Sequence, residues 1–187
     1  MMTRASLSRA QLGIVALLSV FGLSMGGSPQ PAPPATVTVT PAAHPPLDAS
    51  AVARIVGTAN PTLSPRELGR IGAAVIRYSG KYEINPEIVT AVLLVESGAR
   101  PWARSPKGAM GLMQVMPNMA GPLALGGNST TIESNVEAGC LILSDNIRRL
   151  GEEEGISAYF WGSDIRGVAY LQRIQAARER VRRLENS

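Results

Sequence analysis

From about residue 48 to the C-terminus, apolar residues recur at three- and four-residue spacing, which is the pattern of amphipathic helices. One such stretch begins at Ser64 and places Leu68, Ile71, Val75 and Tyr78 on a single face. It opens with Ser-Pro-Arg-Glu, which has the form of a capping box with proline at the first helical position. No run alternates apolar and polar residues for long enough to predict a strand. The pattern therefore predicts an all-α domain.

Further helices are expected over residues 48–57, from 85 to about 96, over 135–150, and after Asp164, which is expected to cap the last one. Cys140 falls on the apolar face of the third of these helices. This position predicts a buried, unreactive thiol rather than a nucleophile.

One carboxylate, Glu96, continues an apolar stripe. Val89, Val92 and Leu93 precede it by seven, four and three residues, so all three share its helix face. Burial disfavours the charged form of a carboxylate, and the negative end of the helix dipole acts in the same direction. Glu96 is therefore a candidate general acid that stays protonated near neutral pH. The alternative is a surface glutamate on the last helical turn.

Residue usage excludes several kinds of active site. The only histidine, His44, lies in a proline-rich stretch, and the only cysteine is Cys140. A Ser-His-Asp triad, a Cys-His nucleophile and a Cys/His zinc site are therefore excluded from the globular part. We expect neither a metal nor an organic cofactor, and chemistry carried by carboxylates, tyrosines, amides, lysine or hydroxyls.

The charge balance is weakly basic. The chain has 18 basic and 14 acidic residues, and two of the basic ones, Arg4 and Arg9, lie at the N-terminus. This excess is too small to predict nucleic-acid binding, but it is compatible with an acidic polymer such as a cell-wall glycan.

The N-terminal region has the features of an export signal. Residues 1–27 combine Arg4 and Arg9 with an apolar run and a stretch of small residues, which predicts a signal peptide or, alternatively, an uncleaved membrane anchor. Residues 28–47 are rich in proline and predict an extended linker. The expected domain then spans residues 48–187. The protein is predicted to be exported to the periplasm or cell envelope, with an inner-membrane anchor as the alternative.

Four motifs follow one another in the globular part: Glu96-Ser97, Ser-Pro-Lys-Gly-Ala at 105–109, Gly-Leu-Met-Gln at 111–114, and Ala-Tyr-Phe-Trp-Gly at 158–162. In this order and at these separations they resemble the catalytic domain of the soluble lytic transglycosylases, over about residues 65–180. That resemblance implies a lysozyme-like helical fold of the goose-type and a peptidoglycan substrate.

The resemblance also implies roles for single positions. Glu96 would be the catalytic acid/base. Five further residues would line the sugar cleft or support the carboxylate: Ser105, Met113, Gln114, Tyr159 and Tyr170. Other interpretations stay open for some of them. Met113 is also suited to the core. The three aromatic residues at 159–161 could form a cluster between helices instead of a sugar platform. Tyr170 could simply belong to the apolar face of its helix.

The family's reaction cleaves the β-1,4 bond between N-acetylmuramic acid and N-acetylglucosamine, and it leaves a 1,6-anhydro sugar. Most glycosidases use two carboxylates. No second candidate accompanies Glu96, since Glu87 lies at the other end of its helix and Glu133 and Glu137 lie in another segment. The alternatives are a lysozyme-type hydrolase and a catalytically silent peptidoglycan-binding or scaffolding domain of an envelope assembly, with partner proteins there.

The sequence departs from the family pattern at three places. Phe160 stands where the Ala-Tyr-Asn motif has asparagine, Ala99 and Arg100 replace an aromatic-Asn pair, and only ten residues separate Tyr159 from Tyr170. These departures predict a small, specialised member that keeps Glu96, Gln114 and both tyrosines.

Overall fold

The structure is a computed structural model that describes residues 47–120 and 131–187. The predicted signal peptide or anchor (1–27) and nearly all of the predicted linker (28–47) lie outside these residues. The helices are α1 (Ala49–Ala59), α2 (Pro65–Lys81), α3 (Pro86–Ser97), α4 (Pro117–Ala120), α5 (Ile132–Leu150), α6 (Glu152–Trp161) and α7 (Ala169–Glu185). The described ranges contain no strand, only two isolated bridges in the loop after α3. The all-α prediction is confirmed.

Local sequence explains where most helices begin. Ser64 and Glu67 form the predicted capping box, in which the Glu67 carboxylate accepts from the Ser64 amide at 2.9 Å and Ser64 Oγ accepts from the Glu67 amide at 3.3 Å. The Asn85 side chain caps α3 by accepting from the Glu87 amide at 2.8 Å.

The prediction for the last helix was wrong at its start. Helix α7 begins at Ala169, and Asp164 pairs with Arg166 instead, at 2.6 Å.

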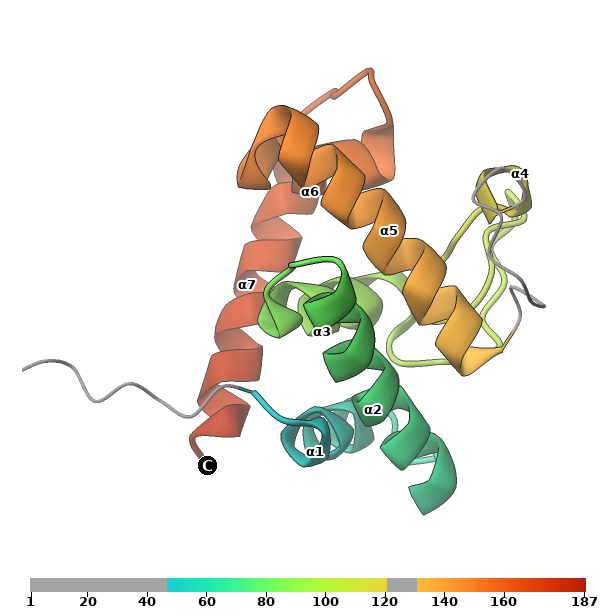
Figure 1. The fold of residues 1–187 in the computed structure, drawn as a ribbon, viewed down its shortest axis with the longest axis vertical. Helices are drawn as coiled ribbons and strands as arrows, with labels where there is room; N and C mark the ends of the chain where they lie inside the picture. The colour runs from blue at the N-terminus through green and yellow to red at the C-terminus, as the bar shows by residue number, and fades with distance from the viewer. Residues whose placement is uncertain (1–46, 121–130) are drawn as a thin grey trace, which may run out of the picture. The chain divides into compact units, whose positions relative to one another are not determined.

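Helix α3 lies in the middle of the helical unit, with α7 on one side and α2 and α5 on the other (Figure 1). Five of its apolar residues are at most 1% exposed: Ile88, Val89, Ala91, Val92 and Leu93. A helix that is apolar around most of its circumference is suited to a buried position. The central helix therefore carries Glu96 at its C-terminal end from within the core.

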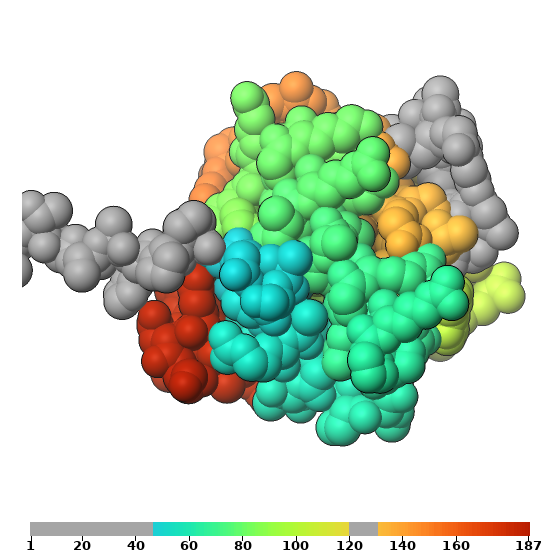
Figure 2. Space-filling model, turned by 60° about the horizontal axis from the view of Figure 1, so that its bottom comes forward, coloured from blue at the N-terminus to red at the C-terminus, as the bar shows by residue number. Residues whose placement is uncertain are grey.

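Helix α1 lies between α2 and the C-terminal end of α7 on one face of the molecule (Figure 2). It approaches α2 closely at Gly72, where a Cβ atom would stand 2.1 Å from the carbonyl oxygen of Ala49. Arg54 of α1 donates to the Leu184 carbonyl at 3.1 Å. These contacts join α1 to both α2 and α7.

Cys140 is buried, as predicted, and burial raises the pKa of its thiol.

None of the described helices combines the length and the apolar character that crossing a bilayer requires.

Candidate active site

Glu96 lies on the last turn of α3, where the chain leaves the core. Gly98 ends the helix in the left-handed conformation, with φ of 60°, and Ala99 follows with the same φ. The motif serine, Ser97, is buried and fixes this turn, because its Oγ donates to the Leu93 carbonyl at 3.0 Å and accepts from the Arg100 amide at 3.2 Å. The chain then folds back beside Glu96.

Tyr170 is the direct partner of Glu96. It reaches the site from the first turn of α7, is 3% exposed, and donates its hydroxyl to Glu96 Oε1 at 2.6 Å. Burial raises the pKa of Glu96, and the Tyr170 hydrogen bond and the charge of Arg173 offset part of that rise. The direction agrees with the sequence prediction of a carboxylic acid that holds its proton at higher pH than usual.

The loop after α3 is held in shape by its own backbone. The Ser105 amide donates to the Ala109 carbonyl at 2.9 Å, the Gly111 amide donates to the Ala103 carbonyl at 2.8 Å, and Met110 and Val115 exchange two bonds of 3.0 Å. Ser105 Oγ adds a bond by accepting from the Ala109 amide at 3.0 Å. Ser105 is therefore held at the edge of the site.

Asn135 of α5 anchors this loop, a role that the sequence motifs did not reveal. Its side chain donates to the Met110 carbonyl at 2.8 Å and accepts from the Met113 amide at 2.9 Å. A Cβ at Gly111 would stand 2.4 Å from the Asn135 amide group, which explains why glycine is needed there. A buried asparagine on an otherwise apolar helix face was the available signal.

Gln114 lies beside Glu96 and has an unusual backbone conformation, with φ of 49°. Its amide nitrogen donates to the carbonyls of Ala103 and Gly111, at 3.2 and 3.0 Å. Because both partners are carbonyls, the amide oxygen is the atom that this arrangement leaves for a ligand.

Met113 does not line the cleft. Its side chain is fully buried, and it occupies the space beside Gly139, where a Cβ would stand 2.4 Å from the Met113 sulfur. The expectation of a sugar contact from this side chain is therefore corrected. The apolar side chain fills a gap that a glycine on α5 leaves open.

Tyr159 supports the loop rather than the carboxylate directly. Its hydroxyl donates to the Met113 carbonyl at 2.8 Å, next to Gln114. Burial and the nearby charge of Glu96 raise the pKa of Tyr159, which keeps it a neutral hydrogen-bond donor.

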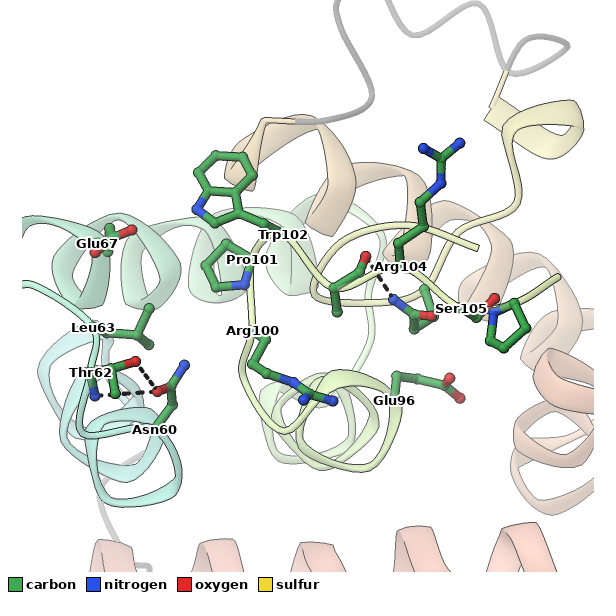
Figure 3. A pocket seen from close by; sticks show the side chains of 13 residues that line it. Asn60, Thr62, Leu63, Glu67, Glu96, Arg100, Pro101, Trp102, Arg104 and Ser105 are labelled. Carbon is green, nitrogen blue, oxygen red and sulfur yellow. Dashed lines mark hydrogen bonds between the residues drawn. The ribbon is translucent and has the colours of Figure 1, made fainter. Parts of the chain in front are cut away.

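Two cavities meet at Glu96, and both are lined by Glu96, Ser105, Pro106 and Gln114. The first, of about 690 Å³, extends towards Asn60, Leu63 and Trp102, none of which the motifs had marked. Figure 3 shows Glu96 and Ser105 on one side of this cavity and Asn60, Thr62 and Leu63, from the α1–α2 connection, on the other.

The second cavity, of about 840 Å³, lies on the α6 side of Glu96. Its lining includes three consecutive aromatic residues, Tyr159, Phe160 and Trp161. A carboxylic acid with a cavity on each side is suited to a linear polymer that extends in both directions from the bond being cut. Within the described residues, no group of three or more His, Cys, Asp or Glu side chains is placed to hold a metal ion.

Comparison with known proteins matches the chain to one family. The family model for the transglycosylase SLT domain matches residues 73–175, which is more than half of the chain. A protein named transglycosylase from the Enterobacteria phage PRD1 is 36% identical over 95 residues, covering 50% of this chain and 34% of its own length. The chain thus spans about a third of that curated relative.

Solved structures with similarity include the 70 kDa soluble lytic transglycosylase of Escherichia coli, with 26% identity, a TM-score of 0.45, and coverage of 60% of this chain and 22% of that one. A complex of the 70 kDa soluble lytic transglycosylase with bulgecin A has 25% identity, a TM-score of 0.46 and the same coverage. The family match over residues 73–175 confirms the resemblance drawn from the motifs and, with it, the lysozyme-like fold class. This chain belongs to the transglycosylase SLT domain family.

Proposed function

We propose that the protein is a peptidoglycan lytic transglycosylase that cleaves the β-1,4 bond between N-acetylmuramic acid and N-acetylglucosamine and forms a 1,6-anhydro-N-acetylmuramic acid end. The observation that carries the proposal is the partly buried Glu96, bonded to Tyr170 at 2.6 Å and flanked by a cavity on each side. Family membership supports the substrate class.

Glu96 acts alone in the proposed mechanism. Among the described residues, the only other carboxylate that lines either cavity is Glu67, and its Oε2 is bonded to the amide and hydroxyl of Ser64, at 2.9 and 2.7 Å. Those hydrogen bonds lower the pKa of Glu67 and hold it at the start of α2. Figure 3 places Glu67 on the side of the cavity away from Glu96. Glu67 is therefore a poor second catalytic group.

The substrate then has to supply the nucleophile. Protonated Glu96 donates its proton to the glycosidic oxygen, and the bond from that oxygen to C1 of N-acetylmuramic acid breaks. The Glu96 carboxylate next takes the proton of the C6 hydroxyl, whose oxygen forms the new bond to C1. Glu96 ends the cycle protonated, and no water is consumed. The Tyr170 hydroxyl stabilises the carboxylate between the two steps.

Of the remaining positions, Gln114 and Ser105 are proposed to orient the sugar through the Gln114 amide oxygen and the Ser105 hydroxyl. Tyr159 is proposed to hold the loop that carries Gln114. No metal or organic cofactor takes part in these steps.

The decisive experiment is mass spectrometry of purified sacculi digested with the protein and with Glu96→Gln. Anhydro-terminated muropeptides from the wild type, reduced at least a hundredfold in the variant, are the expected result, because general acid catalysis alone contributes about 10²–10⁴ in rate. Reducing-end products would establish the lysozyme-type hydrolase instead. A folded protein that releases nothing would favour the silent binding or scaffolding domain, or an enzyme that requires a partner.

We further propose that the protein is exported and acts on glycan strands in the periplasm or cell envelope, with proteins of an envelope assembly as candidate partners. Residues 1–27 are proposed to be a signal peptide or an inner-membrane anchor, and nucleic acid is not proposed as a partner. The mass of the mature protein, measured separately in the soluble and membrane fractions, distinguishes cleavage from anchoring.

A further inference from the structure

Phe160 is the most exposed ring of the α6 aromatic cluster, with 52% of its surface exposed, whereas Tyr159 and Trp161 are half-buried. It lines the cavity on the α6 side of Glu96. An exposed phenylalanine on the wall of a cavity offers an apolar contact surface at that place. This is also the position where the motif of the family has asparagine.

Two neighbouring rings hold the Phe160 ring in a fixed orientation. It stacks on Tyr170, with ring centroids 4.9 Å apart and planes at 16°, and it meets Trp161 edge to face, with centroids 4.9 Å apart and planes at 89°. Tyr170 is itself fixed by its bond to Glu96. The orientation of Phe160 is therefore coupled, through one ring, to the position of the proposed catalytic carboxylate.

A ring held in this way is suited to one kind of ligand surface. A pyranose in its chair form carries axial C–H groups on its faces and hydroxyls around its edge, so a flat aromatic ring packs against the face while an amide would bond the edge. A pre-ordered ring also loses little side-chain entropy when the ligand arrives.

We propose that Phe160 is a stacking platform for a saccharide ring of the glycan strand, in the subsite on the α6 side of Glu96. An asparagine at this position would recognise the sugar through polar contacts, whereas Phe160 offers an apolar contact instead. This difference makes Phe160 a specificity-determining residue. The inference rests on the proposed function of the same cleft. It selects Phe160 from the three aromatic residues because Phe160 is the only one of them that is exposed, and because the Tyr159 hydroxyl is already bonded to the Met113 carbonyl.

The test compares Phe160→Leu, which keeps an apolar side chain without the ring, with Phe160→Tyr, which keeps the ring. Leu150→Ala is the control, because Leu150 is an exposed apolar residue (39%) that lines neither cavity. For each full-length protein, KM, kcat and the pH profile of kcat are measured on soluble glycan strands freed of peptide cross-links. Binding of the same strands is measured with each change placed in the Glu96→Gln background.

The expected result is a rise of roughly tenfold in KM and in the dissociation constant for Phe160→Leu, near the upper end of what one aromatic contact contributes. For Phe160→Leu we expect kcat to stay within about twofold of the wild-type value and its pH profile to keep its position. Phe160→Tyr and Leu150→Ala are expected to bind the glycan strands like the parent protein.

Unchanged binding by Phe160→Leu would overturn the platform while leaving anhydro-product formation by the wild type, and so the proposed function, intact. A lower kcat with a displaced pH profile and unchanged KM would also overturn it, because the ring would then only position Tyr170. Conversely, weaker binding by Phe160→Leu in a protein that releases no product would support the platform and refute the transglycosylase proposal.

Discussion

In the proposed mechanism, the reaction depends on the pH at which Glu96 gives up its proton, and opposing effects at single residues set that pH. Burial favours the neutral acid, whereas the Tyr170 hydroxyl at 2.6 Å and the charge of Arg173 favour the carboxylate. The net effect raises the pKa of Glu96. An acid balanced in this way can protonate a leaving group and still exist as a base in the next step.

Replacing Tyr170 with phenylalanine removes a group that stabilises the Glu96 carboxylate. The pKa of Glu96 should rise further, so the pH above which activity declines should move upward. At the same time kcat should fall by about tenfold or more, because the carboxylate loses its orienting partner. The pH dependence of kcat measures both effects. A decline at unchanged pH would show that Tyr170 does not interact with the proposed catalytic acid.

The Glu96→Gln variant should also be more stable than the wild type at neutral pH. A carboxyl group whose pKa is raised by folding stabilises the folded state below its unfolded pKa, and that stability is lost as pH rises through the folded pKa. A neutral amide avoids this loss. We expect a higher Tm for the variant at pH 7 and little difference near pH 4, measured by thermal melts at both values. A Tm lower than that of the wild type at pH 7 would contradict the raised pKa.

At the scale of the helices, close backbone contact sets the geometry. A Cβ at Gly72 of α2 would stand 2.1 Å from the Ala49 carbonyl of α1, and a Cβ at Gly155 of α6 would stand 2.6 Å from the Cα of Ile147 in α5. Backbone atoms cannot move aside as a flexible side chain can. These glycines are therefore required by packing between helices, and they are not places where the helices end.

Two glycines of α2 test this point against each other. Gly72→Ala should lower the free energy of unfolding by about 2 kcal/mol or more, because α1 has to move away. Gly69→Ala, in the same helix, meets nothing within 4 Å and should raise it by about 0.5–1 kcal/mol. Denaturant unfolding of both variants gives the comparison. If both variants changed the free energy of unfolding equally, helix propensity alone, and not packing between helices, would determine the effect of each substitution.

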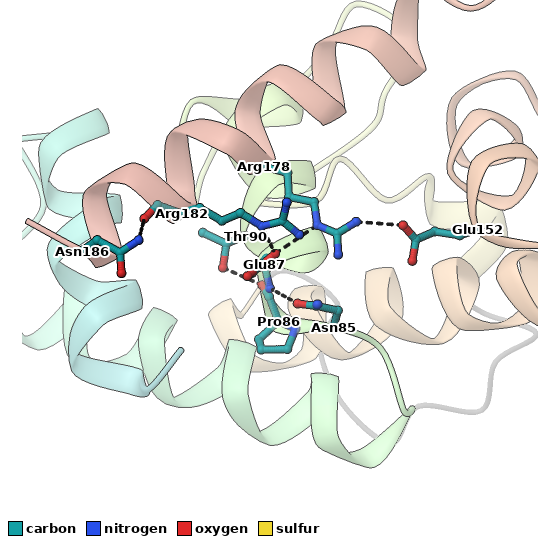
Figure 4. Close-up of polar contacts among 8 residues, drawn as sticks. All are labelled: Asn85, Pro86, Glu87, Thr90, Glu152, Arg178, Arg182 and Asn186. Atoms are coloured by element: carbon teal, nitrogen blue, oxygen red, sulfur yellow. Dashed lines mark hydrogen bonds and ion pairs between the residues drawn. The ribbon is translucent and has the colours of Figure 1, made fainter. Parts of the chain in front are cut away.

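At the scale of the molecule, the site exists because α7 packs against α3. An ionic cluster fixes that contact: Glu87, at the start of α3, accepts from Arg178 at 3.0 Å and from Arg182 at 2.8 Å, and Arg178 also bonds Glu152 of α6 at 2.7 Å (Figure 4). The cluster lies at the opposite end of α3 from Glu96. It holds the helix that carries Tyr170 in register with the helix that carries Glu96.

Removing the central arginine of this cluster should loosen the domain. Arg178→Met should cost about 1–3 kcal/mol of unfolding free energy, because the Arg178 and Glu87 side chains are only 20% and 19% exposed and two carboxylates lose a partner. Arg183→Met is the matched control: its 3.9 Å pair with Glu179 is 69% exposed on both sides, so we expect a change below about 0.5 kcal/mol. Thermal melts with and without added salt separate the two cases, and equal losses would contradict the role of the cluster.

The sequence by itself determined the helical class, the capping of α2, the burial of Cys140 and the motif order that places the chain in its family. These features depend on local spacing, and periodicity and capping act within a few residues. Helical spacing also marked Glu96 as a candidate acid, whereas Tyr170 was named as a site residue only through the resemblance.

Only the tertiary structure decided the rest. It moved Met113 into the core because Gly139, on a helix far along the chain, leaves a space that a sulfur atom fills. It showed that Asn135 holds the glycine-rich loop through two hydrogen bonds, and that Phe160 stacks on Tyr170 beside Glu96. It also placed the start of α7 five residues after the expected cap. Each of these outcomes depends on which residues meet across helices. Residue spacing along the sequence does not indicate contacts between segments that lie far apart in the chain.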